Sequence, residues 1–130
     1  LSFSCSSPGK ARWKQLSQQH CGYCVPCLIR RAAMHKAFGD DGTVYTETSI
    51  YEMQNKNAEG MGIQLRSFQY AIDKIKQDRN RALFYIHKPG PLPQDDEYLR
   101  ELADTYIRGL LEVDAFIQDN LAQEDENNDL

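Results

Sequence analysis

The pattern of cysteines constrains the fold of this chain more than any other feature of its sequence. All four lie near one end, in the order C-x15-C-x2-C-x2-C: Cys5, Cys21, Cys24 and Cys27. Two cysteines separated by two residues can direct both sulfur atoms at one point, because the residues between them form a tight turn. Three cysteines in such a run supply most of a tetrahedral shell, and one distant cysteine completes it. The sequence therefore predicts one zinc site with four thiolate ligands.

Three other uses of the same residues remain open. The cysteines could form disulfides, although four in 130 residues is sparse for a disulfide scaffold and we expect no signal peptide. They could hold an iron–sulfur cluster, since ferredoxins use similar spacing, but the run does not continue past Cys27. His20 could replace one sulfur ligand, because it precedes Cys21 directly. We favour zinc bound by reduced thiols and expect a cytoplasmic protein.

The end of the chain that carries the cysteines is also basic. Residues 1–38 have no acidic residue, whereas the whole chain has a net charge of -4. The basic residues in this segment are Lys10, Arg12, Lys14, Arg30, Arg31 and Lys36. A basic segment beside a metal site suits a phosphate, a nucleotide or a nucleic acid, and Trp13 and Tyr23 are available for stacking on bases. It would serve equally as a solvated surface that offsets the charge of the thiolates.

The same residues resemble the zinc-binding end of an enzyme family. Ser4-Cys5-Ser6, Arg12-Trp13 and the run Cys-Gly-Tyr-Cys-Val-Pro-Cys-Leu-Ile-Arg at 21–30 are similar to the zinc motif of the 7-cyano-7-deazaguanine synthases. The family consists of ATP-dependent, ligase-type enzymes of queuosine-precursor biosynthesis on a PP-loop ATPase fold. The resemblance covers about the first 38 residues. It implies that the four cysteines are zinc ligands and that Arg30 is the arginine that follows them in the family.

Two departures from the family pattern indicate a divergent branch. The gap between Cys5 and Cys21 is longer than in the biosynthetic enzymes, and a much longer stretch follows Cys27. Both fit the synthase-like proteins of bacterial anti-phage defence operons. We therefore expect the chain to be the carboxyl-terminal part of a longer protein, with an upstream PP-loop domain as its partner and operon proteins as further candidates. Arg12, Arg30 and Arg31 are the candidates for facing the nucleotide or substrate.

No catalytic residue is expected within these 130 residues. The family binds ATP through a Ser-Gly-Gly-x-Asp-Ser loop, and Glu59-Gly-Met-Gly62 is neither that motif nor a Walker loop. His20, His35 and His87 are scattered along the sequence, and no Ser–His–Asp group is evident. ATP would thus be bound only by the upstream domain. The alternative is a stand-alone zinc module that binds nucleic acid, or a helical adaptor that binds a protein partner.

Outside the metal loop the apolar residues recur with helical spacing. We expect a first helix at Pro26–Phe38, with Cys27 in its first turn and Gly39 at its end, and a second from Ile63 to about Gln77, with a continuation through Ile86. Residues 39–61 have a weak pattern and are predicted to be a connecting segment. A long helix should follow Lys88-Pro-Gly-Pro-Leu-Pro93, because prolines and glycine break the preceding helix. We predict that its core face consists of Leu99, Leu102, Tyr106, Leu110, Val113 and Ile117.

These patterns predict a mainly α fold, in which an amino-terminal four-cysteine zinc loop is followed by a small helical bundle. We divide the chain into a zinc-binding module with the first helix at 1–38, a helical region at 39–120 and an acidic tail at 121–130. The tail should be disordered, because it is polar and carries repeated negative charge. No apolar run approaches the roughly 20 residues of a membrane helix, so no membrane partner is expected.

Overall fold

The computed structural model describes residues 4–15, 19–39, 41–55 and 61–129. This part of the chain contains a 3₁₀-helix and five α-helices and has no β-strand. The elements are η1 (Pro8–Lys14), α1 (Val25–Phe38), α2 (Ile50–Asn55), α3 (Met61–Gln77), α4 (Arg81–Tyr85) and α5 (Asp96–Asn128). The prediction of a mainly α chain with a four-cysteine loop near its amino end is confirmed.

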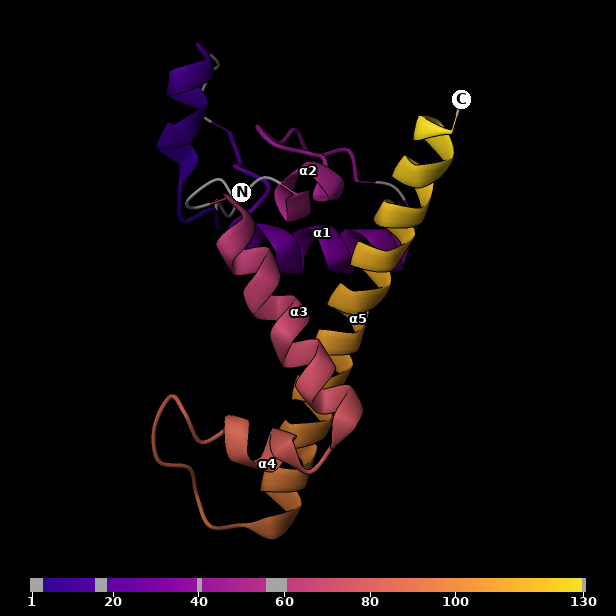
Figure 1. Ribbon diagram of the computed structural model, residues 1–130. Helices are drawn as coiled ribbons and strands as arrows, with labels where there is room; N and C mark the ends of the chain where they lie inside the picture. The colour runs from indigo at the N-terminus through magenta and orange to yellow at the C-terminus, as the bar shows by residue number, and fades with distance from the viewer. Residues whose placement is uncertain (1–3, 16–18, 40, 56–60, 130) are drawn as a thin grey trace.

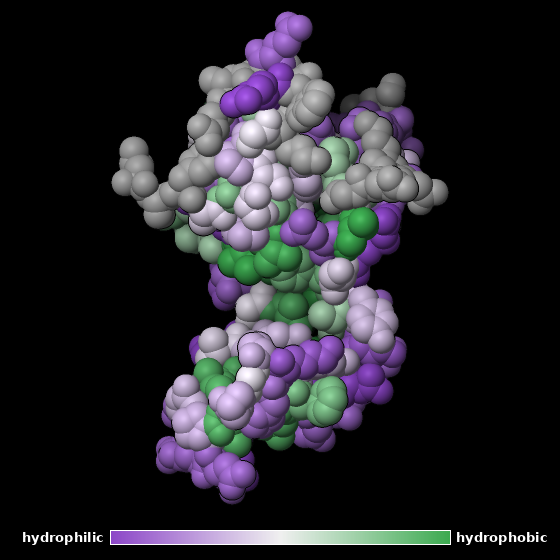
Figure 2. Space-filling model, turned by 90° about the vertical axis from the view of Figure 1, so that its left-hand side faces the viewer, coloured by the Kyte–Doolittle hydropathy of each residue, from purple (hydrophilic) through white to green (hydrophobic). Residues whose placement is uncertain are grey.

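The two longest helices form a V-shaped frame. α3 and α5 lie close together at the end where α4 packs, and they diverge toward the other end (Figure 1). α1 crosses the open end of the V and contacts both long helices, and α2 also contacts both (Figure 1). The metal loop therefore lies at the wide end of the bundle. Seen from one side, the molecule has a narrow middle in and around which hydrophobic side chains gather (Figure 2).

The boundaries of α1 follow from residues at its two ends. Cys24 is the N-cap, so the helix begins one residue earlier than predicted, and Cys27 lies in its first turn as expected. Gly39 adopts a left-handed conformation (φ 74°) and its backbone N–H donates to the carbonyl oxygen of His35. Glycine is the residue that enters this conformation at least cost, so it ends the helix here.

α3 ends where the sequence predicted, but its continuation is a separate helix. The side chain of Asp78 accepts a hydrogen bond of 3.0 Å from the backbone N–H of Asn80, which forms a turn before α4. At the other end of α3, Gly62 lies against α2. A Cβ atom on Gly62 would lie 2.5 Å from the carbonyl oxygen of Met53, so only glycine allows this approach. Gly62 thus has a packing role.

α5 begins at a strong capping residue. The carboxylate of Asp95 accepts hydrogen bonds from the backbone N–H groups of Glu97 and Tyr98, at 3.1 and 3.3 Å. The buried residues of α5 are Ala103, Ile107, Leu110, Val113, Phe116 and Ile117. Of the face predicted from the sequence, Leu110, Val113 and Ile117 are buried, whereas Leu99, Leu102 and Tyr106 are only partly buried. The first turns of α5 extend past the end of α3 and lie beside the short α4, so less structure covers them (Figure 1).

The acidic tail differs from the prediction of disorder beyond residue 120. α5 continues to Asn128. Leu121 packs against the buried core, and the carboxylate of Glu124 accepts a hydrogen bond of 2.8 Å from the backbone N–H of Tyr51 at the start of α2. Leucine, glutamine, alanine and glutamate are also good helix formers. Packing and capping against α2 therefore outweigh the repulsion between like charges.

One buried cluster joins the metal loop to the helices. It includes Cys21, Cys24 and Cys27 of the loop and α1, with Leu28 of α1, Ile50 and Met53 of α2, Leu65 of α3 and Ile117 of α5. The core is thus continuous across residue 38. Within the described ranges, none of the helices is both long enough and apolar enough to cross a bilayer.

Candidate metal centre

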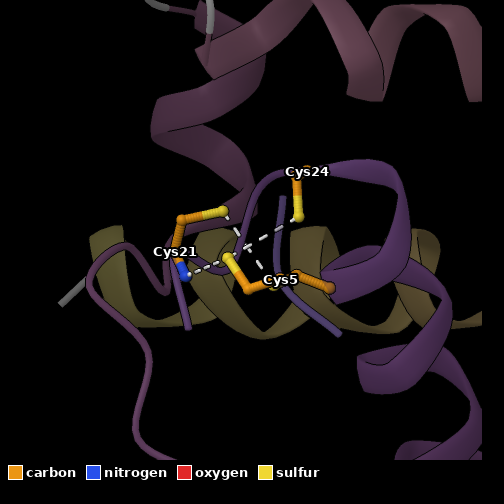
Figure 3. Close-up of side chains that lie close together, drawn as sticks. Cys5, Cys21 and Cys24 are labelled. Atoms are coloured by element: carbon orange, nitrogen blue, oxygen red, sulfur yellow. Dashed lines mark hydrogen bonds between the residues drawn. The ribbon is translucent and has the colours of Figure 1, made fainter. Parts of the chain in front are cut away.

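The four cysteine sulfur atoms converge on one point at the start of α1. All of them lie within 4.8 Å of one another. The Sγ atoms of Cys21 and Cys27 are 3.9 Å apart, and so are those of Cys24 and Cys5. Cys5 comes from the segment before η1, and Cys21 and Cys24 come from the loop that leads into α1; the three side chains turn toward one another (Figure 3). Three of the four residues are fully buried, and Cys5 is partly buried.

This spacing can be compared with what a bound ion requires. A tetrahedral ion with metal–sulfur bonds of about 2.3 Å holds its sulfur atoms about 3.8 Å apart, which follows from the geometry of a tetrahedron. The Cys21–Cys27 and Cys24–Cys5 separations of 3.9 Å agree with that value, and all four sulfur atoms lie within 4.8 Å of one another. A disulfide instead requires an S–S distance of about 2.05 Å, and all four cysteines are free. The residues therefore fit a single metal ion held by four sulfur atoms.

Gly22 gives the metal loop its shape. Its φ of +89° is a conformation that residues with a side chain rarely adopt, and a Cβ atom there would lie 2.1 Å from the carbonyl oxygen of Glu47. The backbone of the neighbouring segment runs alongside the loop. Thr46 and Glu47 donate backbone hydrogen bonds of 2.9 Å to the carbonyl oxygens of His20 and Cys21, and His20 and Tyr45 form a parallel bridge. The segment predicted only to connect elements thus supports the loop directly.

The beginning of α1 supplies two of the ligands. Cys24 is the N-cap and Cys27 lies three residues later, so both sulfur atoms lie where backbone N–H groups are not yet used by the helix. Such N–H groups and the helix dipole favour negative charge on a thiolate. The N–H of Val25 is bound by the side-chain oxygen of Gln64 on α3, at 2.5 Å. This contact joins the metal loop to α3.

Cys5 is held in place from the other side of the site. Its Sγ atom accepts hydrogen bonds from the backbone N–H groups of Ser7 and Cys21, at 3.3 and 3.2 Å. The distant fourth cysteine therefore reaches the site through a fixed backbone contact with the C-x2-C-x2-C run.

Burial and hydrogen bonding act in opposite directions on the thiols. Burial raises the pKa of Cys21 to about 11 and raises the pKa of Cys27 as well. Burial would also raise the pKa of Cys24, but hydrogen bonds from Ser6 and Cys27 outweigh it and lower that pKa to about 6. Several thiolates at one buried site repel one another. A divalent cation would relieve that repulsion and favour ionisation of the whole set.

Two aromatic residues were candidates for stacking on nucleic-acid bases. Tyr23 is 5% exposed and belongs to the core, so this expectation is wrong. Burial, followed by the negative charge of Cys21 and Cys5, raises the pKa of its hydroxyl to about 12. The side chain of Trp13 lies outside the described residues.

The three histidines lie in different surroundings. His20 is buried beside the centre, with its Nδ1 atom 4.0 Å from the Sγ atom of Cys27, and its ring faces Tyr45. The side chains that can share one ion are the four cysteines, so His20 is a neighbour of the ligand set. His35 contacts Asp119 on α5 at 2.8 Å, and His87 is exposed.

The three candidate arginines differ in burial and in their contacts. Arg31 is buried, and its guanidinium donates to the carbonyl oxygens of Gly22 and Thr48, at 2.9 and 2.6 Å. Arg30 is partly buried and contacts the hydroxyl of Thr43 at 3.4 Å, while its Nε atom is buried without a hydrogen-bond partner. Arg12 is exposed on η1.

Sequence reasoning missed the residues that hold the loop from outside. Gln64, Glu47 and Thr48 carry no motif, and their roles depend on contacts between distant segments. Gly22 was visible as part of the Cys-Gly-Tyr-Cys run, and a glycine between two ligands is a signal of special backbone geometry. Comparison of the chain with family models, with curated proteins and with solved structures found no match.

Proposed function

We propose that this chain is a structural zinc-binding unit, with one Zn²⁺ held by Cys5, Cys21, Cys24 and Cys27. The observation that carries the proposal is the convergence of four sulfur atoms, all within 4.8 Å, in a set of residues that is largely buried. Four sulfur ligands complete a tetrahedron and leave no position for water or substrate, which is typical of structural zinc sites. A multinuclear iron–sulfur cluster would need more space between the sulfur atoms, because its core has to fit among them.

The role of the ion would be to hold the wide end of the bundle together. The cysteines come from the segment before η1, from the loop and from α1, and the loop in turn contacts the 45–48 segment and α3. Structural zinc supplies about 10–16 kcal/mol of binding free energy in small zinc-dependent domains, and that energy is coupled to folding.

The first experiment identifies the metal. Elemental analysis of the purified chain should give one zinc per molecule, and Co²⁺ in its place should give the absorption spectrum of a tetrahedral thiolate site. Cys24→Ser should lose the metal, whereas Ser4→Ala, at an exposed neighbouring position, should retain it. Iron with a strong visible band, or a metal-free chain with two disulfides, would contradict the proposal.

We further propose that the unit belongs to a synthase-like, ATP-dependent protein whose chemistry is supplied by an upstream PP-loop domain. The support is the sequence resemblance over the first 38 residues. In such a protein zinc would be structural, and Arg30, whose buried Nε has no partner among the described residues, is the arginine we expect to face the nucleotide or substrate.

A test of this parentage begins with the full reading frame, which should encode a Ser-Gly-Gly-x-Asp-Ser loop upstream. In the intact protein, Arg30→Ala should reduce ATP-dependent turnover while the zinc content stays at one per chain. Arg79→Ala, at an exposed position before α4, is the control and should change neither. ATP hydrolysis by the isolated 130 residues would contradict the assignment of the chemistry to an upstream domain.

A further inference from the structure

A cavity lined by Arg31 lies between α1, the 41–48 segment and α5. Its volume is about 250 Å³. The lining residues that matter here are Arg31, His35, Asp41, Tyr45, Phe116 and Asn120. An engineered cavity of about 150 Å³ holds a benzene molecule, so this one has room for a ring and one further functional group.

The guanidinium of Arg31 is the central charged group of this cavity. Arg31 is 6% exposed, and its guanidinium lies 5.2 Å from the centre of the Tyr45 ring and 5.0 Å from that of Phe116. The two hydrogen bonds to carbonyl oxygens use two of its five N–H groups. Among the residues that the structure describes, no carboxylate forms an ion pair with it. A buried cation without a paired anion is costly, and the fork of a guanidinium matches a carboxylate.

The acidic groups near the cavity are already engaged by other partners. Asp41 accepts hydrogen bonds from the hydroxyl of Tyr45 at 2.5 Å and from the backbone N–H of Thr43 at 2.9 Å. Burial would raise the pKa of Asp41, but these hydrogen bonds hold it below its usual value, so the group is ionised at neutral pH. Asp119 contacts His35, and Glu124 accepts from the backbone of Tyr51.

This balance of charge limits what the cavity can accept. A singly charged anion would pair with Arg31 and tolerate the ionised Asp41, whereas a doubly charged phosphate would be repelled more strongly. Asn120 uses its amide nitrogen on the carbonyl oxygen of Phe116, at 2.8 Å, so its side-chain oxygen is the atom that it can offer to a donor on a ligand. The flanking rings suit a planar or apolar body.

We propose that this cavity binds a small organic monocarboxylate, with Arg31 as the anchor of the carboxylate. The remaining N–H groups of the guanidinium would donate hydrogen bonds to the two carboxylate oxygens, and the body of the ligand would lie along Phe116 and Asn120. The proposal goes beyond the metal site, because none of the four cysteines lines this cavity. It does not depend on the identity of the metal.

The test uses the full, metal-loaded chain and three probes of similar shape: benzoate, benzamide and phenyl phosphate. In a ¹H–¹⁵N NMR titration, benzoate should shift the side-chain Nε–Hε signal of Arg31 and the amide signals near Phe116 and Asn120. A dissociation constant of about 1–10 mM is expected for a ligand of this size. Benzamide and phenyl phosphate should bind at least about tenfold more weakly. Benzamide lacks the negative charge that pairs with Arg31, and phenyl phosphate carries more negative charge, which the ionised Asp41 repels.

Two variants on α5 provide a matched pair. Gln123 lines the cavity and Gln118 does not, and both side chains are exposed. Gln123→Trp should obstruct the cavity and weaken benzoate binding about tenfold or more, whereas Gln118→Trp should leave it unchanged. Arg31→Lys should reduce the preference for benzoate over benzamide, and its metal content and far-UV spectrum report whether it is still folded.

Three outcomes would overturn the proposal. Benzoate and benzamide could bind equally well, which would show that the cavity recognises only an apolar body. Benzoate could cause no shift of the lining residues up to about 20 mM, which would show that the cavity is not a ligand site. Tighter binding of phenyl phosphate than of benzoate would show that the class of ligand is wrong.

Discussion

The guanidinium of Arg31 donates a hydrogen bond of 2.9 Å to the carbonyl oxygen of Gly22, which lies between two of the cysteines. The same group donates to Thr48 and lies against the ring of Phe116 on α5. A residue on α1 therefore connects the metal loop with the 45–48 segment and with the long carboxyl-terminal helix. Burial of the guanidinium lowers the pKa of Arg31, and the nearby Tyr45 and Asp41 oppose that shift. The contact is thus made by a charged group held inside the fold.

The first prediction concerns this connection. Arg31→Met should reduce the free energy of unfolding by about 2–4 kcal/mol, because the buried carbonyl oxygen of Gly22 and the partly buried carbonyl oxygen of Thr48 lose their donor. Denaturant unfolding of the metal-loaded chain measures the change. Arg100→Met, at an exposed position on α5, should change stability by less than about 0.5 kcal/mol. Equal stability of the two variants would show that the Arg31 contacts contribute nothing.

The second prediction concerns Gly22. Gly22→Ala should reduce stability by about 3 kcal/mol or more and weaken metal binding, since the backbone conformation is strained for alanine and its Cβ would meet Glu47. Gly109→Ala on α5 is the control, because nothing lies within 4 Å of the added carbon. That change should stabilise the protein by about 0.5–1 kcal/mol, as expected for glycine in a helix. Thermal unfolding and zinc competition provide the two measurements.

Metal affinity should fall as the pH falls. The raised pKa values of Cys21 and Cys27 mean that both thiols carry protons at neutral pH in the metal-free chain, and binding must displace them. Each displaced proton changes the apparent affinity about tenfold per pH unit, so Cys21 and Cys27 together contribute about 100-fold per pH unit. Below about pH 6 Cys24 also becomes protonated, so the dependence should become steeper. Competition with a chelator between pH 5 and about 8 gives the slope, and an affinity independent of pH would refute this account of the thiols.

Removal of the metal should loosen the wide end of the bundle first. With no ion to link the four sulfur atoms, amide hydrogen exchange should increase in residues 20–24 and 45–48, which are joined by the backbone hydrogen bonds from Thr46 to His20 and from Glu47 to Cys21. The first 38 residues should lose their order, while α3 and the first half of α5 remain helical, because they pack against each other at the far end of the V. Continued protection of residues 20–24 after chelation would show that the loop folds without metal.

The last prediction concerns the acidic end of α5. Glu124→Ala should cost about 1 kcal/mol, since the first turn of α2 loses the acceptor for the N–H of Tyr51. Glu126→Ala, at an exposed position two residues later, should change stability by less than about 0.5 kcal/mol. If the two variants are equal, the contact between the tail and α2 does not stabilise the fold.

Features that depend on neighbouring residues could be predicted from the sequence. The convergence of Cys21, Cys24 and Cys27 follows from their spacing, because two intervening residues leave little freedom in where the sulfur atoms lie. The start of α5 follows from Asp95, whose side chain accepts hydrogen bonds from backbone N–H groups two and three residues later. The end of α1 follows from Gly39, which adopts the left-handed conformation that ends a helix.

Features that depend on distant segments were decided only by the tertiary structure. Tyr23 looked available for stacking, yet it is buried in the core. Whether a residue is buried depends on which other segments pack against it. The tail looked disordered by its charge, yet α2 lies where Leu121 and Glu124 can contact the rest of the protein. From the sequence, Arg31 was one of three candidates for facing a nucleotide or substrate, and only the packing of α1 against α5 brings its guanidinium between Gly22, Thr48 and Phe116. Contacts of this kind join residues far apart in the chain, so local spacing carries no information about them.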